Sequence, residues 1–250
     1  MRAILTYHSI DPSGSPISID RESFARHVEF LASGAVRVVP LAEILAPGDE
    51  PRVAITFDDG IGNFANAAWP LLHEHGLPAT QFVVTRRAGS SNDWQGRRDA
   101  RVPHLPLMDW DTLGRLASEG LDLGAHSRTH PHLDRVSESA LAEEVEGSAA
   151  DLQERTGIRP RAFCYPYGSL DERAVSRVAR RFEIACTTVL APLGAGDSAH
   201  RLPRLDAFYL RGPGRLEAFG ALGFRLRLSV LRRARELRQG LARRGDPSRS

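Results

Sequence analysis

The chain contains no lysine, because all 33 of its basic residues are arginine. Without lysine, Schiff-base chemistry and the phosphate-binding lysine of a P-loop are excluded. A strong charge of one sign is also missing, since the formal net charge is only +2 at pH 7. The overall charge therefore gives no indication of a nucleic-acid partner.

Cysteine and long apolar runs are equally scarce. Cys164 and Cys186 each lie in a short apolar run typical of a strand. A chain of 250 residues does not need a disulfide for stability, so we predict two buried free thiols. No stretch is long enough to span a bilayer, and the apolar run in residues 1–8 is too short for a signal peptide. We expect a cytoplasmic protein, at the inner membrane surface if its C-terminal segment binds lipid.

Strand-like and helix-like segments alternate along most of the chain, which predicts parallel βα units. Polar or aromatic residues follow the strand-like segments. The clearest are Tyr7-His8, Asp58-Asp59, His126 and Tyr165-Pro166-Tyr167, and Arg204 follows a further expected strand. In an α/β barrel the carboxyl ends of the strands converge on one mouth. An open doubly wound sheet usually has a glycine-rich dinucleotide turn, which this sequence lacks. The expected helices span residues 21–33, 63–75 with a kink at Pro70, 109–120, 137–156 and 171–181.

Asp58 and Asp59 are two adjacent carboxylates between the strand-like run 53–57 and Gly60. They repel each other, and a bound metal ion or a shared proton is the usual compensation. The alternative is a solvated pair in a turn. His126 and His130 are four residues apart, so one helical turn or a tight loop can direct both imidazoles at one ion.

Two imidazoles and one carboxylate form a ligand set that holds Zn²⁺, Co²⁺ or Fe²⁺ and leaves positions open for water and substrate. The second aspartate is then free to take a proton from that water. The combination indicates metal-assisted hydrolysis.

Three motifs resemble those of the polysaccharide deacetylases, carbohydrate esterase family 4, which share the NodB homology domain. They are Thr56-Phe57-Asp58-Asp59-Gly60, the segment from His126 to His130 followed by Pro131, and Phe163-Cys164-Tyr165-Pro166-Tyr167-Gly168. The resemblance covers roughly residues 1–210, and Tyr7-His8-Ser9-Ile10 resembles the opening of the family's exopolysaccharide branch. It implies a distorted (β/α)₇ barrel, in residues 1–219, that removes acetyl groups from N-acetylated sugars at the carboxyl ends of its strands.

The resemblance also implies roles for single residues. Asp59, His126 and His130 would hold one divalent metal, Zn²⁺ first, with Co²⁺, Ni²⁺ or Fe²⁺ as alternatives. Asp58 would be the general base, and the backbone N–H of Tyr167 would help to stabilise the oxyanion. Tyr165 and Pro166 would form the floor of the sugar site, although a proline turn with packed aromatic rings would give the same pattern.

The sequence departs from the family pattern in two places. Cys164 stands where the third motif often has an arginine, and we expect Arg204 to replace it through a bidentate contact with Asp58, unless it is a surface arginine. No histidine follows His200, although family members often supply a late histidine as general acid. His8, His200 or a metal-bound water could take that role, with His8 preferred unless it is a buried structural histidine.

The segment 220–250 differs in composition. From Ala221 onward it has nine arginines against Glu236 and Asp246, and Val230, Ala234, Leu237 and Leu241 are spaced as one helix face. Such a basic amphipathic helix could lie on an anionic membrane or pack on its own domain. Two other functions stay open: a barrel that binds glycan without catalysis, prompted by the missing histidine, and an amidohydrolase for a small cyclic or linear amide. An enzyme without a signal peptide would act on a lipid-linked or nucleotide-linked precursor.

Overall fold

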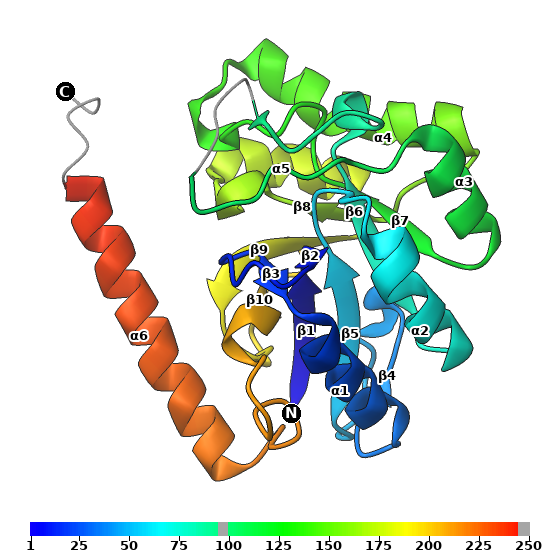
Figure 1. Cartoon of the computed structure of the whole chain (residues 1–250). Helices are drawn as coiled ribbons and strands as arrows, with labels where there is room; N and C mark the ends of the chain where they lie inside the picture. Colours follow the sequence, from blue (N-terminus) through cyan, green and yellow to red (C-terminus); the bar gives the residue numbers. More distant parts are fainter. Residues whose placement is uncertain (95–99, 245–250) are drawn as a thin grey trace.

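The computed structural model describes residues 1–94 and 100–244. Its centre is a closed barrel of seven parallel strands, in the order β1-β10-β9-β8-β7-β6-β5 with β5 paired back to β1 (Figure 1). These strands are β1 (Arg2–Tyr7), β5 (Arg52–Phe57), β6 (Ala79–Val83), β7 (Asp122–Ala125), β8 (Ala162–Cys164), β9 (Ile184–Leu190) and β10 (Leu202–Asp206). The predicted seven-stranded (β/α) barrel is confirmed.

Short strands complete the sheet structure. β4 (Arg37–Val38) pairs with the first residues of β5, whereas β6 pairs with its last residues. β2 (Ser9–Ile10) and β3 (Ser18–Ile19) form a separate parallel pair within the turn-rich segment that follows β1. This small sheet was not predicted, because two-residue strands leave no periodic pattern in a sequence.

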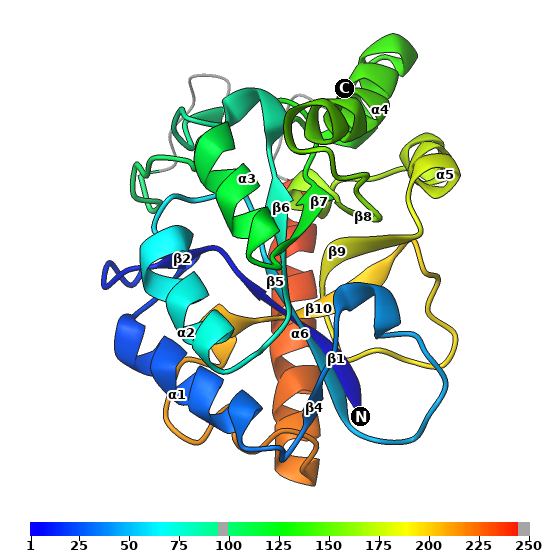
Figure 2. The ribbon, with the colours of Figure 1, turned by 90° about the vertical axis from the view of Figure 1, so that its right-hand side faces the viewer.

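Among the described residues there are six α-helices. The first five surround the barrel, and the sixth lies along one side of it (Figures 1 and 2). Four of the first five begin at a residue whose side chain accepts a hydrogen bond from a backbone N–H of the first turn. This capping explains why the sequence predicted those helix starts correctly. The helices are α1 (Arg21–Ala32), α2 (Trp69–Glu74), α3 (Trp110–Ser118), α4 (Glu138–Thr156), α5 (Glu172–Arg181) and α6 (Leu222–Arg244).

The expected helix over residues 63–75 is two elements. Residues Phe64–Ala68 form a π-helical turn, and α2 begins at Trp69 with Pro70 in its first turn. Proline has no N–H to donate, so the first turn of a helix accommodates it without a broken bond. Pro70 therefore lies where the π-helical turn changes to α2, so the segment is helical as expected and its irregularity is at the predicted proline.

The two cysteines are buried free thiols, as predicted. The C-terminal segment forms α6, which packs on the barrel through Phe224 and Leu228. The stripe predicted from Val230 and Leu237 does not make this contact, since these two side chains are 67% and 70% exposed. The Leu241 side chain and residues 245–250 lie outside the described part. No helix of the described residues has the length and apolar content needed to cross a membrane.

Candidate metal centre and catalytic cavity

A cavity of about 850 Å³ opens at the carboxyl ends of the barrel strands. Most of the residues predicted for the site line it: His8, Asp58, Asp59, His126, His130, Tyr165, Tyr167 and Arg204. Pro166 is not among the described residues that line this cavity, and neither is His200. The fold thus brings together residues from both ends of the chain, as expected for a barrel mouth.

Asp59, His126 and His130 converge at one side of the cavity. The Nε2 atoms of both imidazoles lie 3.4 Å from Oδ1 of Asp59. One ligand atom from each of the three residues lies within 4.8 Å of the others, and all three residues are buried. His126 donates from Nδ1 to the carbonyl oxygen of Cys164 at 2.7 Å, which directs its Nε2 toward Asp59. This arrangement fits a divalent cation held by two imidazoles and a carboxylate.

A second possible set is Asp58, His126 and Cys164. It fits a cation less well, because both carboxylate oxygens of Asp58 already accept hydrogen bonds from Arg204 and Nδ1 of His126 already donates to a carbonyl.

Residues with left-handed backbone angles orient the candidate metal ligands Asp59, His126 and His130. Asp59, Ser127 and His130 have φ angles of 71°, 63° and 64°, values that residues other than glycine rarely adopt. The segment from His126 to His130 is therefore a tight loop, the second of the two predicted alternatives. Strain of this kind persists only where the surrounding structure holds it.

Glu144 of α4 stabilises the loop from His126 to His130 by hydrogen bonds. Its Oε2 accepts hydrogen bonds from the backbone N–H groups of Arg128 and Thr129 at 2.8 and 2.9 Å. Its Oε1 accepts from the Thr129 hydroxyl at 2.6 Å. Sequence reasoning missed this residue, although its position three residues after Leu141 on an amphipathic helix puts it on the buried face.

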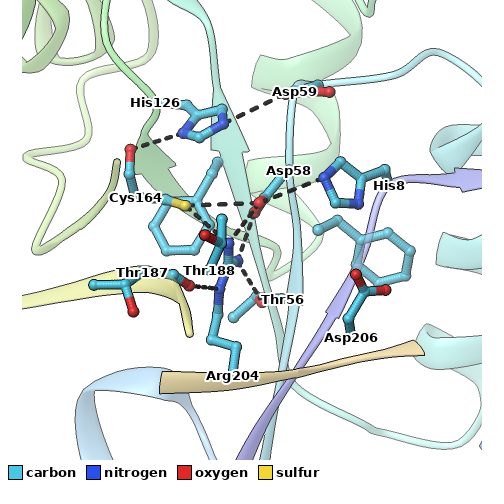
Figure 3. Close-up of polar contacts among 12 residues, drawn as sticks. His8, Thr56, Asp58, Asp59, His126, Cys164, Thr187, Thr188, Arg204 and Asp206 are labelled. Atoms are coloured by element: carbon cyan, nitrogen blue, oxygen red, sulfur yellow. Dashed lines mark hydrogen bonds and ion pairs between the residues drawn. The ribbon is translucent and has the colours of Figure 1, made fainter. Parts of the chain in front are cut away.

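Asp58 has a different environment, shown in Figure 3. Arg204 donates to its two carboxylate oxygens at 2.7 Å each, so the predicted bidentate contact is present. The same guanidinium donates to the Thr187 carbonyl at 2.9 Å and lies 3.1 Å from the sulfur of Cys164. Arg204 is a residue within β10 and not one that follows a strand. Its guanidinium thus reaches Asp58 beside Cys164, although Arg204 belongs to β10 and Cys164 to β8.

The two aspartates are both ionised. Burial alone would raise the pKa of Asp58, but the charge and hydrogen bonds of Arg204 lower it to about 2. Burial would likewise raise the pKa of Asp59, and its contacts with His126 and His130 instead hold it well below the usual value. Burial also lowers the pKa of His130, which keeps this imidazole neutral and able to donate a lone pair.

The histidines considered as general acids lie in different places. His8 lines the cavity with its Nε2 3.7 Å from Oδ2 of Asp58. His200 instead has its Nε2 2.9 Å from the carbonyl oxygen of Phe182, which lies between α5 and β9. Only His8 of these two therefore faces the carboxylates.

Asp206, the last residue of β10, also lines the cavity, and burial raises its pKa while the charge of His8 opposes that shift. Sequence reasoning did not single it out. Its place at the end of a strand, two residues after Arg204, was the available indication.

Aromatic rings form one wall of the cavity. Trp94 stacks on His130 with ring centroids 4.3 Å apart, and Tyr167 packs edge-on against the same imidazole at 4.4 Å. Tyr167 also stacks on His132 at 4.2 Å and is 47% exposed. Tyr165 lines the cavity too, with its hydroxyl bonded to the His200 carbonyl. Stacked rings beside a polar centre are suited to hold the apolar face of a sugar ring.

The model of the polysaccharide deacetylase family matches residues 46–185, more than half of the chain. The chain belongs to this family. The matched range contains Asp58 and the three candidate metal ligands, whereas His8 and Arg204 lie outside it.

Curated relatives and solved structures agree with this assignment. The poly-beta-1,6-N-acetyl-D-glucosamine N-deacetylase of Staphylococcus epidermidis is 23% identical over 76% of this chain and 70% of its own length. The peptidoglycan-N-acetylglucosamine deacetylase of Bacillus cereus is 27% identical over 50% of this chain, which spans only 40% of that relative.

Two solved structures share the fold. The deacetylase PplD of Streptococcus pyogenes, in complex with acetate, has a TM-score of 0.70 at 19% identity, covering 82% of this chain and 91% of that chain. IcaB from Ammonifex degensii has a TM-score of 0.69 at 23% identity, covering 83% of this chain and 94% of that chain.

Proposed function

We propose that this protein is a metal-dependent hydrolase that removes N-acetyl groups from a glycan or glycolipid containing N-acetylhexosamine. The observation that carries the proposal is the different surroundings of two adjacent carboxylates. Asp59 lies 3.4 Å from the Nε2 atoms of both His126 and His130, whereas Asp58 is bound by Arg204 on both oxygens. One carboxylate is therefore suited to hold a cation and the other to handle a proton.

Asp59, His126 and His130 would hold the divalent cation, and Zn²⁺ suits this ligand set best, with Co²⁺, Ni²⁺ or Fe²⁺ as alternatives. The bound cation would supply Lewis acidity that polarises the amide carbonyl and makes the attacking water more acidic. This contribution matters here because a carboxylate with a pKa of about 2, such as Asp58, is a weak base by itself.

Asp58 takes the proton from the water that attacks the acetamide carbon. Arg204 keeps Asp58 ionised and fixes its orientation through two parallel hydrogen bonds. The backbone N–H of Tyr167, at a residue with a φ of 59°, contributes to stabilising the developing oxyanion. Each of these groups acts best if it is already in position before the reaction starts.

His8 donates the proton to the departing amine nitrogen. Its support is its place on the cavity wall, 3.7 Å from Asp58 and close enough to Asp206 for their charges to interact. This assignment replaces the late histidine that the sequence lacks.

The acetylated sugar is held by the aromatic wall. Trp94 and Tyr167 offer rings beside His130, and the fully buried Tyr165 also lines the cavity. The names of both curated relatives describe the deacetylation of N-acetylglucosamine, in peptidoglycan for one and in poly-beta-1,6-N-acetyl-D-glucosamine for the other. An N-acetylhexosamine unit is accordingly the substrate that we propose for this chain.

Two variants of the adjacent carboxylates test the division of roles. Asp59→Ala should lose both the bound metal and acetate release, because it removes a ligand. Asp58→Asn should retain the metal while acetate release falls about 10²–10⁴-fold, the usual effect of removing a general base. Metal content is measured by elemental analysis, and acetate release on an N-acetylglucosamine oligomer. Normal turnover by Asp59→Ala would contradict the proposal, and so would metal binding without acetate release from any acetylated amino sugar by the unmodified protein.

A further inference from the structure

Exposed apolar side chains gather on one helix. Six large apolar side chains are exposed among the described residues, and four of them lie on α6: Leu222, Leu226, Val230 and Leu237, which are 60% to 74% exposed. Their spacing of four, four and seven residues places them in one row, which extends over about 22 Å of helix. We call this row the outer stripe.

The opposite side of α6 is apolar as well. Phe224 and Leu228 are buried against the barrel at 5% and 2% exposure, and Leu231 packs beside them. A helix that is apolar on two opposite sides is typical of one that is covered on both. Figures 1 and 2 show α6 running along one side of the barrel with its other side uncovered. The outer stripe is therefore a candidate interaction surface.

The charge of α6 indicates what covers the outer stripe. Five arginines and one acidic residue, Glu236, occur between Leu222 and Leu237, the span of the outer stripe. Arg227 donates to the Tyr209 carbonyl at 2.7 Å, and Arg235 forms an ion pair with Asp206 at 3.7 Å, so these two face the barrel. Arg225 and Arg233 are exposed, and Arg233 lies within the angular range of the outer stripe.

A second copy of the chain would bring the five arginines of one α6 close to those of the other, with Glu236 as the one acidic residue of this segment to compensate them. An anionic bilayer instead attracts the arginines and receives the leucines in its apolar layer. We propose that the outer stripe of α6 docks the protein on an anionic lipid surface, with the helix lying in the plane of that surface.

Docking would also orient the catalytic cavity. Arg235 belongs to α6 and lines the cavity through its side chain. A helix fixed on the lipid surface therefore keeps the cavity at a constant distance from it, where an acetylated sugar carried by a lipid would be within reach. This consequence rests on the proposed deacetylase function, whereas the docking itself does not.

Co-sedimentation of the full chain with vesicles tests the proposal. Vesicles of phosphatidylcholine mixed with phosphatidylglycerol should bind the protein at least about tenfold more tightly than vesicles of phosphatidylcholine alone. Added salt should weaken this binding. Val230→Asp should reduce it about tenfold or more, because it places a carboxylate in the outer stripe. The matched control is Val189→Asp on β9, where the valine is 46% exposed outside α6 and the same substitution should leave binding unchanged.

Acetate release from a water-soluble acetylated oligomer is measured on the same proteins and should be equal in all of them. A failure of the proposed function would remove acetate release and leave vesicle binding intact. Equal binding to both kinds of vesicle, or binding to neither, would overturn the docking proposal. A dimer detected by analytical ultracentrifugation that Val230→Asp dissociates would overturn it in favour of a second copy of the chain.

Discussion

Asp58 and Arg204 form an ion pair that is withdrawn from water, with side chains only 3% and 1% exposed. Removing one partner of such a pair leaves a buried charge without compensation, which typically costs about 3–5 kcal/mol. Arg204→Gln should therefore lower the free energy of unfolding by about this amount and raise the pKa of Asp58, because the group that lowers it is gone. Urea denaturation measures the loss of stability.

Arg161→Gln is the matched control for this prediction. Arg161 pairs with Glu183 on the surface, where the two side chains are 58% and 61% exposed. Solvent and salt screen such a pair, so its loss should change stability little. Equal effects of the two substitutions would contradict the special role of the buried pair.

The location of Arg204 shows what the sequence could and could not indicate at this scale. The sequence allowed either a buried partner of Asp58 or a surface arginine. In β10 all residues from Leu202 to Leu205 are buried, so an alternation of buried and exposed positions could not select one face. Arg204 is buried because it pairs with Asp58, which is 146 residues away in the chain. A contact of that separation has no local pattern in the sequence.

At the scale of elements, α4 holds the loop that carries His126 and His130. Glu144→Gln replaces one accepting oxygen by an amide N–H₂ group, which cannot accept from Arg128 N–H and Thr129 N–H. The loop should then hold its left-handed residues less firmly, and the dissociation constant for Zn²⁺ should rise about 10–100-fold, as is usual for residues that support metal ligands. Metal titration measures this change.

The neighbouring Glu143→Gln is the control on the same helix. The side chain of Glu143 is 69% exposed and forms ion pairs with the side-chain nitrogens of Arg86 and Arg128. Its substitution should leave the affinity for Zn²⁺ unchanged, and equal weakening by both variants would show that the loop does not depend on Glu144.

Elements with strong local patterns were predictable, and those set by tertiary contacts were not. The starts of α1, α3, α4 and α5 follow from capping residues that the sequence displays. The pairing of His126 with His130 was also predicted from their spacing. The positive φ angles at Ser127 and His130 were not, because the loop that contains them is bonded to Glu144 of α4, and such a tertiary contact has no local sequence pattern.

At the scale of the whole molecule, His27 joins parts of the chain that are far apart in sequence. This buried histidine of α1 contacts the Tyr7 hydroxyl of β1 through Nδ1 at 2.9 Å. Its Nε2 lies 3.0 Å from the carbonyl oxygen of Leu210, which follows β10. Because β1 and β10 are neighbours in the barrel, these bonds link α1 to β1 and to the segment that directly follows β10.

Burial holds the pKa of His27 below its usual value, although its bond to the Leu210 carbonyl opposes the shift. In the unfolded chain the same imidazole titrates near a pKa of about 6.5. Above that pH the histidine is neutral in both states and has no effect on the pH dependence. Below it the unfolded chain takes up a proton that the folded chain resists, so the free energy of unfolding should fall as the pH falls.

Urea denaturation at a series of pH values should show a shallower decline of the free energy of unfolding for His27→Gln than for the unmodified protein. His75→Gln changes an exposed histidine at the end of α2 and should leave the decline unchanged. Parallel curves for the unmodified protein and His27→Gln would show that other groups determine the acid sensitivity of the barrel.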